Sequence, residues 1–287
     1  MLCRIVLALL WLLPVAPAAA AGLKLSTWNL EWLTERPAGD PSLPDDVSPK
    51  SRAGLARLAA YARRLDADAV GIEEVDGAAM AGRVFPADAY TVLLTDDAVV
   101  QRVGLALRRG IAFTRHPDLV ALDVSPPDDP HRLRRGLDVT IGDGPDEIRV
   151  LVVHLKSGCW DSPLNDRLRA ACPMLAAQIP VIERWIADRQ REGDAFAILG
   201  DFNRRMNAGD PFYAALASAA PLTRTTAGRA SPCWGGEDFI DHILLGGPAR
   251  DWLVPGSLRV LVYDEHDPAM QAVISDHCPV SVRLDLP

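Results

Sequence analysis

Hydrophobic positions along this chain fall into many short runs and a few longer periodic stretches. The short apolar runs predict buried strands, and the run at 148–155 is the most strand-like of all. Stretches whose apolar residues recur on one face predict helices at 50–65, about 165–188 and 211–218. Pro180 is expected to bend the second helix, because proline has no amide donor. The predicted strands are 23–28, 69–72, 90–94, 103–108, 136–141, 148–155, 195–199, 239–245, 258–262 and 279–284.

This order of elements predicts an α/β protein with two sheets. Strands outnumber helices, and the chain contains neither a G-x-G-x-x-G fingerprint nor a P-loop, which argues against a doubly wound nucleotide-binding sheet. Two β-sheets stacked face to face with helices outside fit the pattern better. Pro- and Asp-rich stretches at 37–49 and 125–130 are typical of surface loops. We expect one domain over residues 22–287.

The N-terminal segment, 1–21, has a different pattern from the rest. Arg4 precedes an apolar stretch at 5–13, and alanines fill 18–21. This pattern indicates a secretory signal peptide, so we expect a mature protein that is exported to a periplasm or secreted. An uncleaved N-terminal anchor is the alternative. No later run is long enough to span a membrane, and we expect no stable membrane insertion after the signal is removed.

Four cysteines remain beyond this segment: Cys159, Cys172, Cys233 and Cys278. An even number in an exported protein favours disulfides, and four cysteines allow three pairings. We hypothesise Cys159–Cys172, which would clip the loop after the strand at 148–155, and Cys233–Cys278, which would tie the segment before the strand at 239–245 to the C-terminal strand. A metal cluster is the weaker alternative, because no C-x-x-C spacing occurs.

The charge balance restricts the partners of the protein. The net charge is −8, and it becomes −9 when Arg4 leaves with the signal peptide. No Lys/Arg-rich tail is present. An acidic protein that acts on a polyanion needs a divalent cation to offset the repulsion, and tight non-specific coating of DNA is not expected. Nothing in the chain predicts oligomerisation, so we expect a monomer.

The motif Gly200-Asp201-Phe202-Asn203 closes a predicted buried strand. Side chains two residues apart in an extended chain point the same way, so Asp201 and Asn203 share a face. Asp201 can bind a hard cation or accept a proton from water, and Asn203 can donate a hydrogen bond to an oxyanion. Strand ends in layered α/β folds are the usual location of ligands. A simple Asx-type turn is the alternative reading of the motif.

Other predicted strands end in polar residues of the same kind. Asn29 and Glu31 follow the first strand, and Glu73-Glu74 follow the second. Adjacent acids point to opposite sides of an extended chain, so only one can face a site, and we favour Glu74. Glu73 then faces away or adds charge near the site.

The later strands add histidines and aspartates to this set. His154 lies in an apolar strand, where a histidine usually packs in the core, but Lys156 shares its face. Asp241 is the first residue of an Asp-His pair in the strand predicted at 239–245. A second such pair, Asp276-His277, lies near the C-terminus. An aspartate and a histidine on neighbouring strands can form a dyad in which the carboxylate orients the imidazole.

Together these motifs resemble the endonuclease/exonuclease/phosphatase superfamily, which includes DNase I-like proteins. The resemblance rests on Trp-Asn, Glu, His, Gly-Asp-Phe-Asn, Ile-Asp-His and Ser-Asp-His in this order, and it covers the chain from Leu25 to the C-terminal strand. It implies a four-layer α/β/β/α sandwich of two stacked mixed β-sheets flanked by helices. It also implies metal-dependent hydrolysis of phosphate esters, with Mg²⁺ as the expected ion and Mn²⁺ or Ca²⁺ as alternatives.

The resemblance also assigns roles to individual residues. Glu74 would be the main metal ligand, with Asn29 and Asp276 beside it. His154 would contact the scissile phosphate, and Asp201 and Asn203 would position the attacking water. Asp241 would orient His277, and either Asp201 or the Asp241–His277 dyad would deprotonate the water. We add Lys156 as a phosphate-binding residue. In the cluster 132–135 either Arg135 or Arg134 could face the phosphate, a solvated loop is the alternative for most of the cluster, and we select Arg135.

Two departures from the family pattern stand out. Glu73 occupies a position where the family often has glutamine. Some secreted DNases pair the residue equivalent to His154 with a glutamate on an earlier strand, and the strand at 103–108 contains no carboxylate. The partner of His154 is therefore left open.

The substrate is less well specified than the reaction. An exported nuclease, an endonuclease or other phosphodiesterase acting on DNA or RNA, is favoured by export and by the basic residues at 132–135 and 204–205. A sphingomyelinase-type lipid phosphodiesterase would need an apolar membrane-entering projection, and aromatic residues are sparse. A phosphatase of sugar or inositol phosphates is a further alternative. A non-catalytic binding protein on the same fold is disfavoured, because every motif residue is present.

Overall fold

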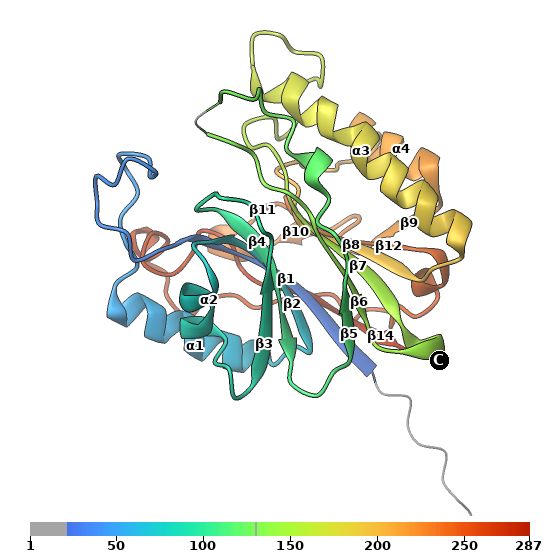
Figure 1. Cartoon of the computed structure of the whole chain (residues 1–287), viewed down its shortest axis with the longest axis horizontal. Helices are drawn as coiled ribbons and strands as arrows, with labels where there is room; N and C mark the ends of the chain where they lie inside the picture. Colours follow the sequence, from blue (N-terminus) through green and yellow to red (C-terminus); the bar gives the residue numbers. More distant parts are fainter. Residues whose placement is uncertain (1–21, 130) are drawn as a thin grey trace, which may run out of the picture.

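Two six-stranded mixed sheets lie face to face in the computed structural model, and helices cover the outer face of each (Figure 1). The structure describes residues 22–129 and 131–287, so the expected signal peptide, 1–21, lies outside the described residues. The chain therefore has the predicted four-layer α/β/β/α architecture.

The first sheet carries two helices and most of the N-terminal half. Its elements are β1 (Gly22–Leu33), α1 (Arg52–Leu65), β2 (Ala69–Val75), α2 (Ala78–Val84), β3 (Tyr90–Leu94), β4 (Arg102–Arg108), β13 (Arg259–Val260) and β14 (Val280–Asp285). The strand order is β13-β14-β1-β2-β4-β3. β1 runs parallel to β2 and antiparallel to β14, so the C-terminal ends of β1 and β2 lie beside the start of β14.

The second sheet is built in the same way from the central part of the chain. Its elements are β5 (Phe113–Arg115), β6 (Leu137–Ile141), β7 (Ile148–His154), α3 (Ala171–Glu192), β8 (Phe196–Asp201), α4 (Pro211–Ala219), β9 (Leu222–Arg224) and β12 (Asp241–Gly246). The order is β5-β6-β7-β8-β12-β9. β7 and β8 are parallel, and β12 is antiparallel to β8, so its first residue, Asp241, pairs with Asp201.

Short elements complete the fold. A two-stranded ribbon projects before β12, and single 3₁₀ turns join several loops. These are β10 (Ala230–Ser231), β11 (Glu237–Asp238), η1 (Val120–Leu122), η2 (Gly144–Asp146), η3 (Cys233–Gly235), η4 (Gly247–Arg250) and η5 (Pro268–Met270).

Three hydrophobic cores hold the four layers together. The first lies between α1, α2 and the outer face of the first sheet, where Leu55, Leu58 and Leu65 pack as the helical periodicity predicts. The second lies between the two sheets and contains Leu105 and Val152. The third lies under α3 and α4. Because each strand of the sheet centres is buried on both faces, its sequence reads as a continuous apolar run.

The observed elements differ from the sequence predictions mainly at irregular points. β1 continues to Leu33, past a shift in its register with β2 after Asn29. α3 begins at Ala171 rather than near 165, because residues 160–170 form a loop closed by a disulfide between Cys159 and Cys172. Short elements such as α2, β5 and β9 carry too few residues for a periodic signal. In the described ranges, no helix combines the length and apolarity needed to cross a membrane.

Candidate active site

Polar side chains from both sheets meet at one end of the sandwich. Asn29 and Glu74 come from the ends of β1 and β2, and His154 and Asp201 pair with each other at the ends of β7 and β8. Asp241 starts β12 beside Asp201. Parallel strands bring their C-terminal ends to the same edge, which is why motifs far apart in the sequence converge here.

Asn29 joins the acids of the two sheets. Its Nδ2 donates to Glu74 Oε1 at 3.2 Å and to Asp201 Oδ2 at 3.1 Å, and its Oδ1 accepts from the Glu31 amide at 2.9 Å. The side chain is buried. A buried carboxamide with both ends engaged holds one orientation, so Asn29 sets the separation of the two carboxylates.

A left-handed turn at the end of β1 supplies a second contact to Glu74. Glu31 and Trp32 have φ values of 43° and 47°. This conformation directs the Trp32 amide to Glu74 Oε2, at 3.0 Å. Glu74 itself has φ of 62°, a strained value for a residue with a side chain. Both Glu74 oxygens are thus held in place by donors from β1.

Glu73 has a different partner from Glu74, although it lies close enough to Asp241, Asp201 and His277 for their charges to affect its pKa. It is fully buried, and its Oε1 accepts from Thr27 Oγ1 at 2.9 Å. Its Oε2 has no hydrogen-bond partner among residues 22–129 and 131–287. Burial, followed by the nearby charge of Asp241, raises the pKa of Glu73 well above its ordinary range. Both causes favour the neutral form of the side chain.

The Gly200–Asn203 motif forms a compact turn at the end of β8. Gly200 has φ of 142°, and a Cβ there would collide with the backbone carbonyl of Val153, so only glycine fits. Asp201 Oδ1 accepts from the Asn203 amide at 2.8 Å, and Asn203 Nδ2 donates to Asp201 Oδ2 at 3.1 Å and to the Leu155 carbonyl at 3.2 Å. The Asx turn and the functional pair are thus the same structure.

Asp201 carries an unusually high proton affinity. Burial raises the pKa of Asp201 to about 7, the charges of Asp241 and Glu74 act in the same direction, and His277 opposes them. Burial is the main cause, because it disfavours the charged form of the carboxyl, and the neighbouring carboxylates add to it.

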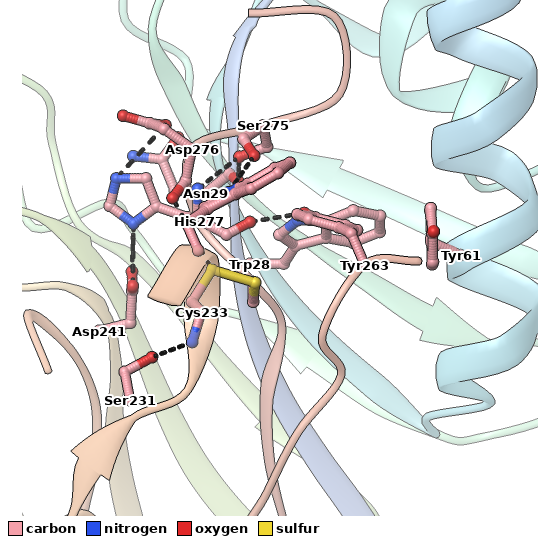
Figure 2. Close-up of a disulfide and its surroundings, with 12 residues drawn as sticks. Trp28, Asn29, Tyr61, Ser231, Cys233, Asp241, Tyr263, Ser275, Asp276 and His277 are labelled. Carbon is pink, nitrogen blue, oxygen red and sulfur yellow. Dashed lines mark hydrogen bonds and ion pairs between the residues drawn. A yellow bond between two sulfur atoms is a disulfide. The ribbon is translucent and has the colours of Figure 1, made fainter. Parts of the chain in front are cut away.

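Asp241 and His277 form the expected dyad (Figure 2). His277 Nδ1 lies 2.8 Å from Asp241 Oδ2, while Nε2 lies 3.9 Å from Asp201 Oδ2 and 3.7 Å from Asp276 Oδ1. Burial alone lowers the pKa of His277, but the charge and hydrogen bond of Asp241, with help from Asp201 and Asp276, hold it well above its ordinary value. The imidazole is therefore positively charged at neutral pH.

His154 stands on the other side of Asp201 and is neutral. Its Nε2 lies 3.6 Å from both Glu74 Oε1 and Asp201 Oδ2. Burial, followed by the charge of Arg134, lowers the pKa of His154 well below its ordinary value. Its Nδ1 is buried and has no partner in the described part of the chain, in line with the absence of a carboxylate from β4.

The structure places Arg134, rather than Arg135, beside the site. The Arg134 side chain is buried, donates from Nη2 to the Leu155 carbonyl at 3.0 Å, and lies within the field of Glu74 and Asp201. Arg135 donates its backbone amide to Asp97 instead. An irregular loop has no period from which the inward-facing residue could be predicted. Together with Lys156, Arg134 lines a hollow of about 520 Å³ next to His154.

The second basic pair, Arg204-Arg205, does not supply free charge. Arg204 is buried, with Nε and Nη2 both donating to Asp210 Oδ2, and its Nη1 donates to the Cys159 and Ser162 carbonyls. It anchors the loop after β7. Arg205 is shared between Asp161 and Glu237.

Lys50 is a functional candidate that sequence reasoning did not select, and it pairs with Glu31, which the strand-end pattern had pointed out. Lys50 is buried, lies 3.2 Å from Glu31 Oε2, and donates to the carbonyls of Ala272 and Ile274. It thereby joins the end of β1 to the turn that leads into His277. Burial, then the charge of Asp276, raise the pKa of Glu31 to about 7, against the effect of Lys50. The contact joins positions 222 residues apart or more, so no local pattern reveals it.

Both hypothesised disulfides are present and both border the site. Cys159–Cys172 links the loop after β7 to the start of α3. Cys233–Cys278 links η3 to the residue that follows His277 (Figure 2). Each bond therefore restrains a segment that carries a site residue.

The oxygen atoms at this centre fit a hard divalent cation. Glu74 and Asp201 provide carboxylate oxygens from the two sheets, and Glu31 and Asp276 lie beside them, while Asn29 turns its Nδ2 toward both acids and its Oδ1 toward the Glu31 amide. Asp201, Asp241 and His277 also offer ligand atoms within 4.8 Å of one another. Of these two possible cation positions we favour the one at Glu74, because His277 and Asp241 already neutralise each other. A cation would favour the ionised form of Asp201, whose pKa is raised first by burial and then by the charges of Asp241 and Glu74.

Comparison with known proteins gives a consistent result. A model of the Endonuclease/Exonuclease/phosphatase family matches residues 26–277. No curated protein sequence matches. Truncated Caenorhabditis elegans TDP2 is 13% identical with a TM-score of 0.59, and the match covers 92% of this chain and 98% of that one. The 3'-5' exonuclease NExo from Neisseria meningitidis is 17% identical with a TM-score of 0.58, covering 92% and 100%. The human Nocturnin catalytic domain is 12% identical with a TM-score of 0.56, covering 93% and 95%. At these identities the structures show a shared fold.

Proposed function

Because this chain belongs to the endonuclease/exonuclease/phosphatase family, we propose that it is an exported nuclease that hydrolyses phosphodiester bonds with the help of a divalent cation, Mg²⁺ in first place. Phosphate-ester hydrolysis is the activity that its family membership supports directly. The nucleic-acid substrate, the metal and export are the finer parts of the proposal.

The observation that carries the proposal is the pair of histidines on either side of Asp201. His277 is held by Asp241, which raises its pKa, and His154 is buried, which lowers its pKa; their Nε2 atoms lie 3.9 Å and 3.6 Å from Asp201 Oδ2. Asn29 bridges Asp201 to Glu74 between them. A phosphate placed here would meet a cation site, a positive donor and a proton acceptor at once, which is what in-line displacement at phosphorus requires.

The chain's own residues divide the work as follows. When bound, the cation would be held by Glu74 and Asp276, with Asn29 as the neighbour that orients Glu74, and it would neutralise charge on the phosphoryl oxygens. His277 already carries a proton, so it donates a hydrogen bond to a phosphoryl oxygen and stabilises developing charge. Asp201 accepts the proton of the attacking water, and Asn203 holds Asp201 in orientation. His154 donates from Nε2 to the phosphate, leaving Nδ1 unprotonated.

Nucleic acid is favoured as the substrate by the cationic hollow beside His154, which Arg134 and Lys156 line. Two proteins of the same fold are described with nucleic acid: TDP2 from D. rerio complexed with single strand DNA product, and NExo bound to a product DNA hairpin. We rank a lipid phosphodiesterase and a sugar-phosphate phosphatase lower, since neither explains this hollow. The two disulfides support export, and we take the protein to act as a monomer.

Hydrolysis assays on the purified mature protein test the proposal. The substrates are plasmid DNA, single-stranded DNA, RNA, sphingomyelin and bis-p-nitrophenyl phosphate, each with Mg²⁺, Mn²⁺ or EDTA. We expect nucleic acid to be hydrolysed and EDTA to abolish the activity. Asp201→Ala and His277→Ala should each lower kcat by about a hundredfold or more, whereas His266→Ala, an exposed histidine outside the site, serves as the matched control. Activity that ignores EDTA, or exclusive hydrolysis of sphingomyelin, would contradict the proposal.

A further inference from the structure

Two hollows adjoin the catalytic centre, and their charges are opposite. The basic hollow, about 520 Å³, is lined by Arg132, Arg134, Lys156 and His131 against a single acid, Asp129. The acidic hollow, about 440 Å³, contains Asp241, Asp276, Glu237 and Asp238 against Arg205 and the catalytic His277. The two hollows share no lining residue.

Asp201 is connected to both hollows through its two histidine neighbours. On one side it is 3.6 Å from His154, which precedes Lys156 of the basic hollow by two residues. On the other side it is 3.9 Å from His277, which lines the acidic hollow. A phosphate bound at Asp201 therefore has one neighbour on its substrate chain directed to each hollow.

The acidic hollow keeps an excess of negative charge, because Asp241 is paired with His277 and Glu237 shares Arg205 with Asp161, while Asp238 and Asp276 lie beyond these pairs. Arg205 is the only arginine or lysine in its lining, and it is already paired with Asp161 and Glu237. Asp238 is exposed and bonds only weakly to Asn207, at 3.3 Å. Glu237 and Asp238 form β11, outside the catalytic centre. A second phosphate group of the substrate would be repelled here, because like charges within a Debye length interact even at an exposed surface.

The walls of the acidic hollow suit a flat uncharged group. The Trp160 indole is 42% exposed at the rim, and the Arg205 amide donates to its backbone carbonyl at 2.7 Å. Trp234 is held by a hydrogen bond from Nε1 to the Ser275 carbonyl at 3.0 Å. Each tryptophan directly follows a disulfide-bonded cysteine, so both walls are covalently restrained. Exposed indoles of this kind serve as stacking platforms for bases.

We propose that the substrate strand runs through the basic hollow only, and that an unphosphorylated terminal nucleoside unit occupies the acidic hollow against Trp160. The enzyme then removes units from one chain end rather than cutting internally. This inference rests on the proposed nuclease function. Each cycle is a hydrolysis: water adds its hydroxide to phosphorus and gives its proton to Asp201, the ester bond between phosphorus and the strand-side oxygen breaks, and that oxygen takes up a proton. The phosphate leaves with the terminal unit, so the new chain end again carries a hydroxyl group.

Four versions of one single-stranded DNA test the inference, each labelled at an internal base so that the ends stay free. The first strand has hydroxyl groups at both ends, the second has a phosphate at its 3′ end, and the third has a phosphate at its 5′ end. The fourth is closed covalently into a circle and has no ends. With Mg²⁺ we expect stepwise shortening of the hydroxyl-ended strand. A phosphate at one of the two ends should slow it about tenfold, a phosphate at the other end should have little effect, and the circle should resist.

The outcomes separate this inference from the proposed function. The inference is overturned if the circle is cleaved at the rate of the linear strand, or if neither the 3′ phosphate nor the 5′ phosphate slows the reaction. Either result leaves the nuclease function intact. Failure to hydrolyse any of the four with Mg²⁺ or Mn²⁺ overturns both.

Variants of the acidic hollow test the cause. In Glu237→Gln/Asp238→Asn the rate ratio between hydroxyl-ended and phosphate-ended strands should fall from about tenfold to about twofold. The control Asp143→Asn/Glu147→Gln changes the net charge equally at the opposite end of β7 and should keep the full ratio. An equal fall in the control would assign the effect to overall charge and refute the inference.

The wall residue is tested separately. Trp160→Ala should raise KM for the hydroxyl-ended strand about tenfold, and Trp160→Phe should restore most of the affinity, because a phenyl ring still stacks. Equal KM values for the two variants would exclude stacking at this position.

Discussion

Replacing Asp201 by asparagine removes the proposed proton acceptor. In the metal-free protein we expect the free energy of unfolding of this variant, relative to that of the wild type, to increase as the pH rises. The pKa of the buried Asp201 carboxyl is raised from 3.8 to about 7. A carboxyl with a raised pKa binds its proton more tightly in the folded than in the unfolded chain. Its ionisation therefore lowers the free energy of unfolding as the pH rises from about 4 to about 7.

The magnitude follows from the two pKa values. A difference between 3.8 and about 7 corresponds to roughly 4 kcal/mol when the group is fully ionised. Between about pH 5 and pH 8 the wild type should lose roughly 2–3 kcal/mol that Asp201→Asn keeps. The asparagine variant loses some free energy of unfolding for another reason, because its NH₂ group faces the amide donors of Asn29 and Asn203. That cost, about 1–3 kcal/mol, does not vary with pH.

Urea denaturation with EDTA present and the disulfides intact provides the assay. The free energies of unfolding of wild type, Asp201→Asn and the exposed control Asp143→Asn are compared at several pH values. We expect the difference between Asp201→Asn and wild type to grow toward high pH, and Mg²⁺ to stabilise the wild type more than the variant. A difference that stays constant from acid to alkaline pH would refute the assignment of a raised pKa to this residue.

Three further predictions concern the surroundings of Asp201. Asp241→Asn should lower kcat about a hundredfold or more, and NMR titration of the metal-free protein should show the pKa of His277 moving down toward its ordinary value; an unchanged titration would remove Asp241 from its role. Lys50→Met should lower the free energy of unfolding by about 2–4 kcal/mol, because Glu31 is left without its cation. In urea denaturation the Glu31→Gln/Lys50→Met double variant should recover at least half of this loss, and no recovery would contradict the pairing. Arg134→Gln should raise KM for a DNA strand about tenfold but leave that for bis-p-nitrophenyl phosphate nearly unchanged, with Arg134→Lys in between; an equal effect on both substrates would indicate a structural role.

Much of the architecture is predictable from the sequence because it depends on local periodicity. The predicted boundaries of β3 agree with the structure, and those of α1, β4, β7 and β14 differ by one or two residues. The predictions fail where the backbone is irregular. The left-handed turn that carries β1 past Asn29, and the disulfide-closed loop before α3, have no regular side-chain period.

The sequence by itself determined the order of strands and helices and the motifs at the strand ends. Asn29, Glu74, His154 and Asp201 could be expected to meet, because the C-terminal ends of parallel strands lie at one edge of their sheet. Only the tertiary structure decided that Arg134 rather than Arg135 faces the site, that Lys50 pairs with Glu31, and that the two hollows that adjoin the catalytic centre carry opposite charge. These features depend on burial and on contacts between distant loops. Burial and loop contacts of this kind produce no periodic pattern in the sequence. They act through electrostatic interactions whose strength is set by the surrounding fold.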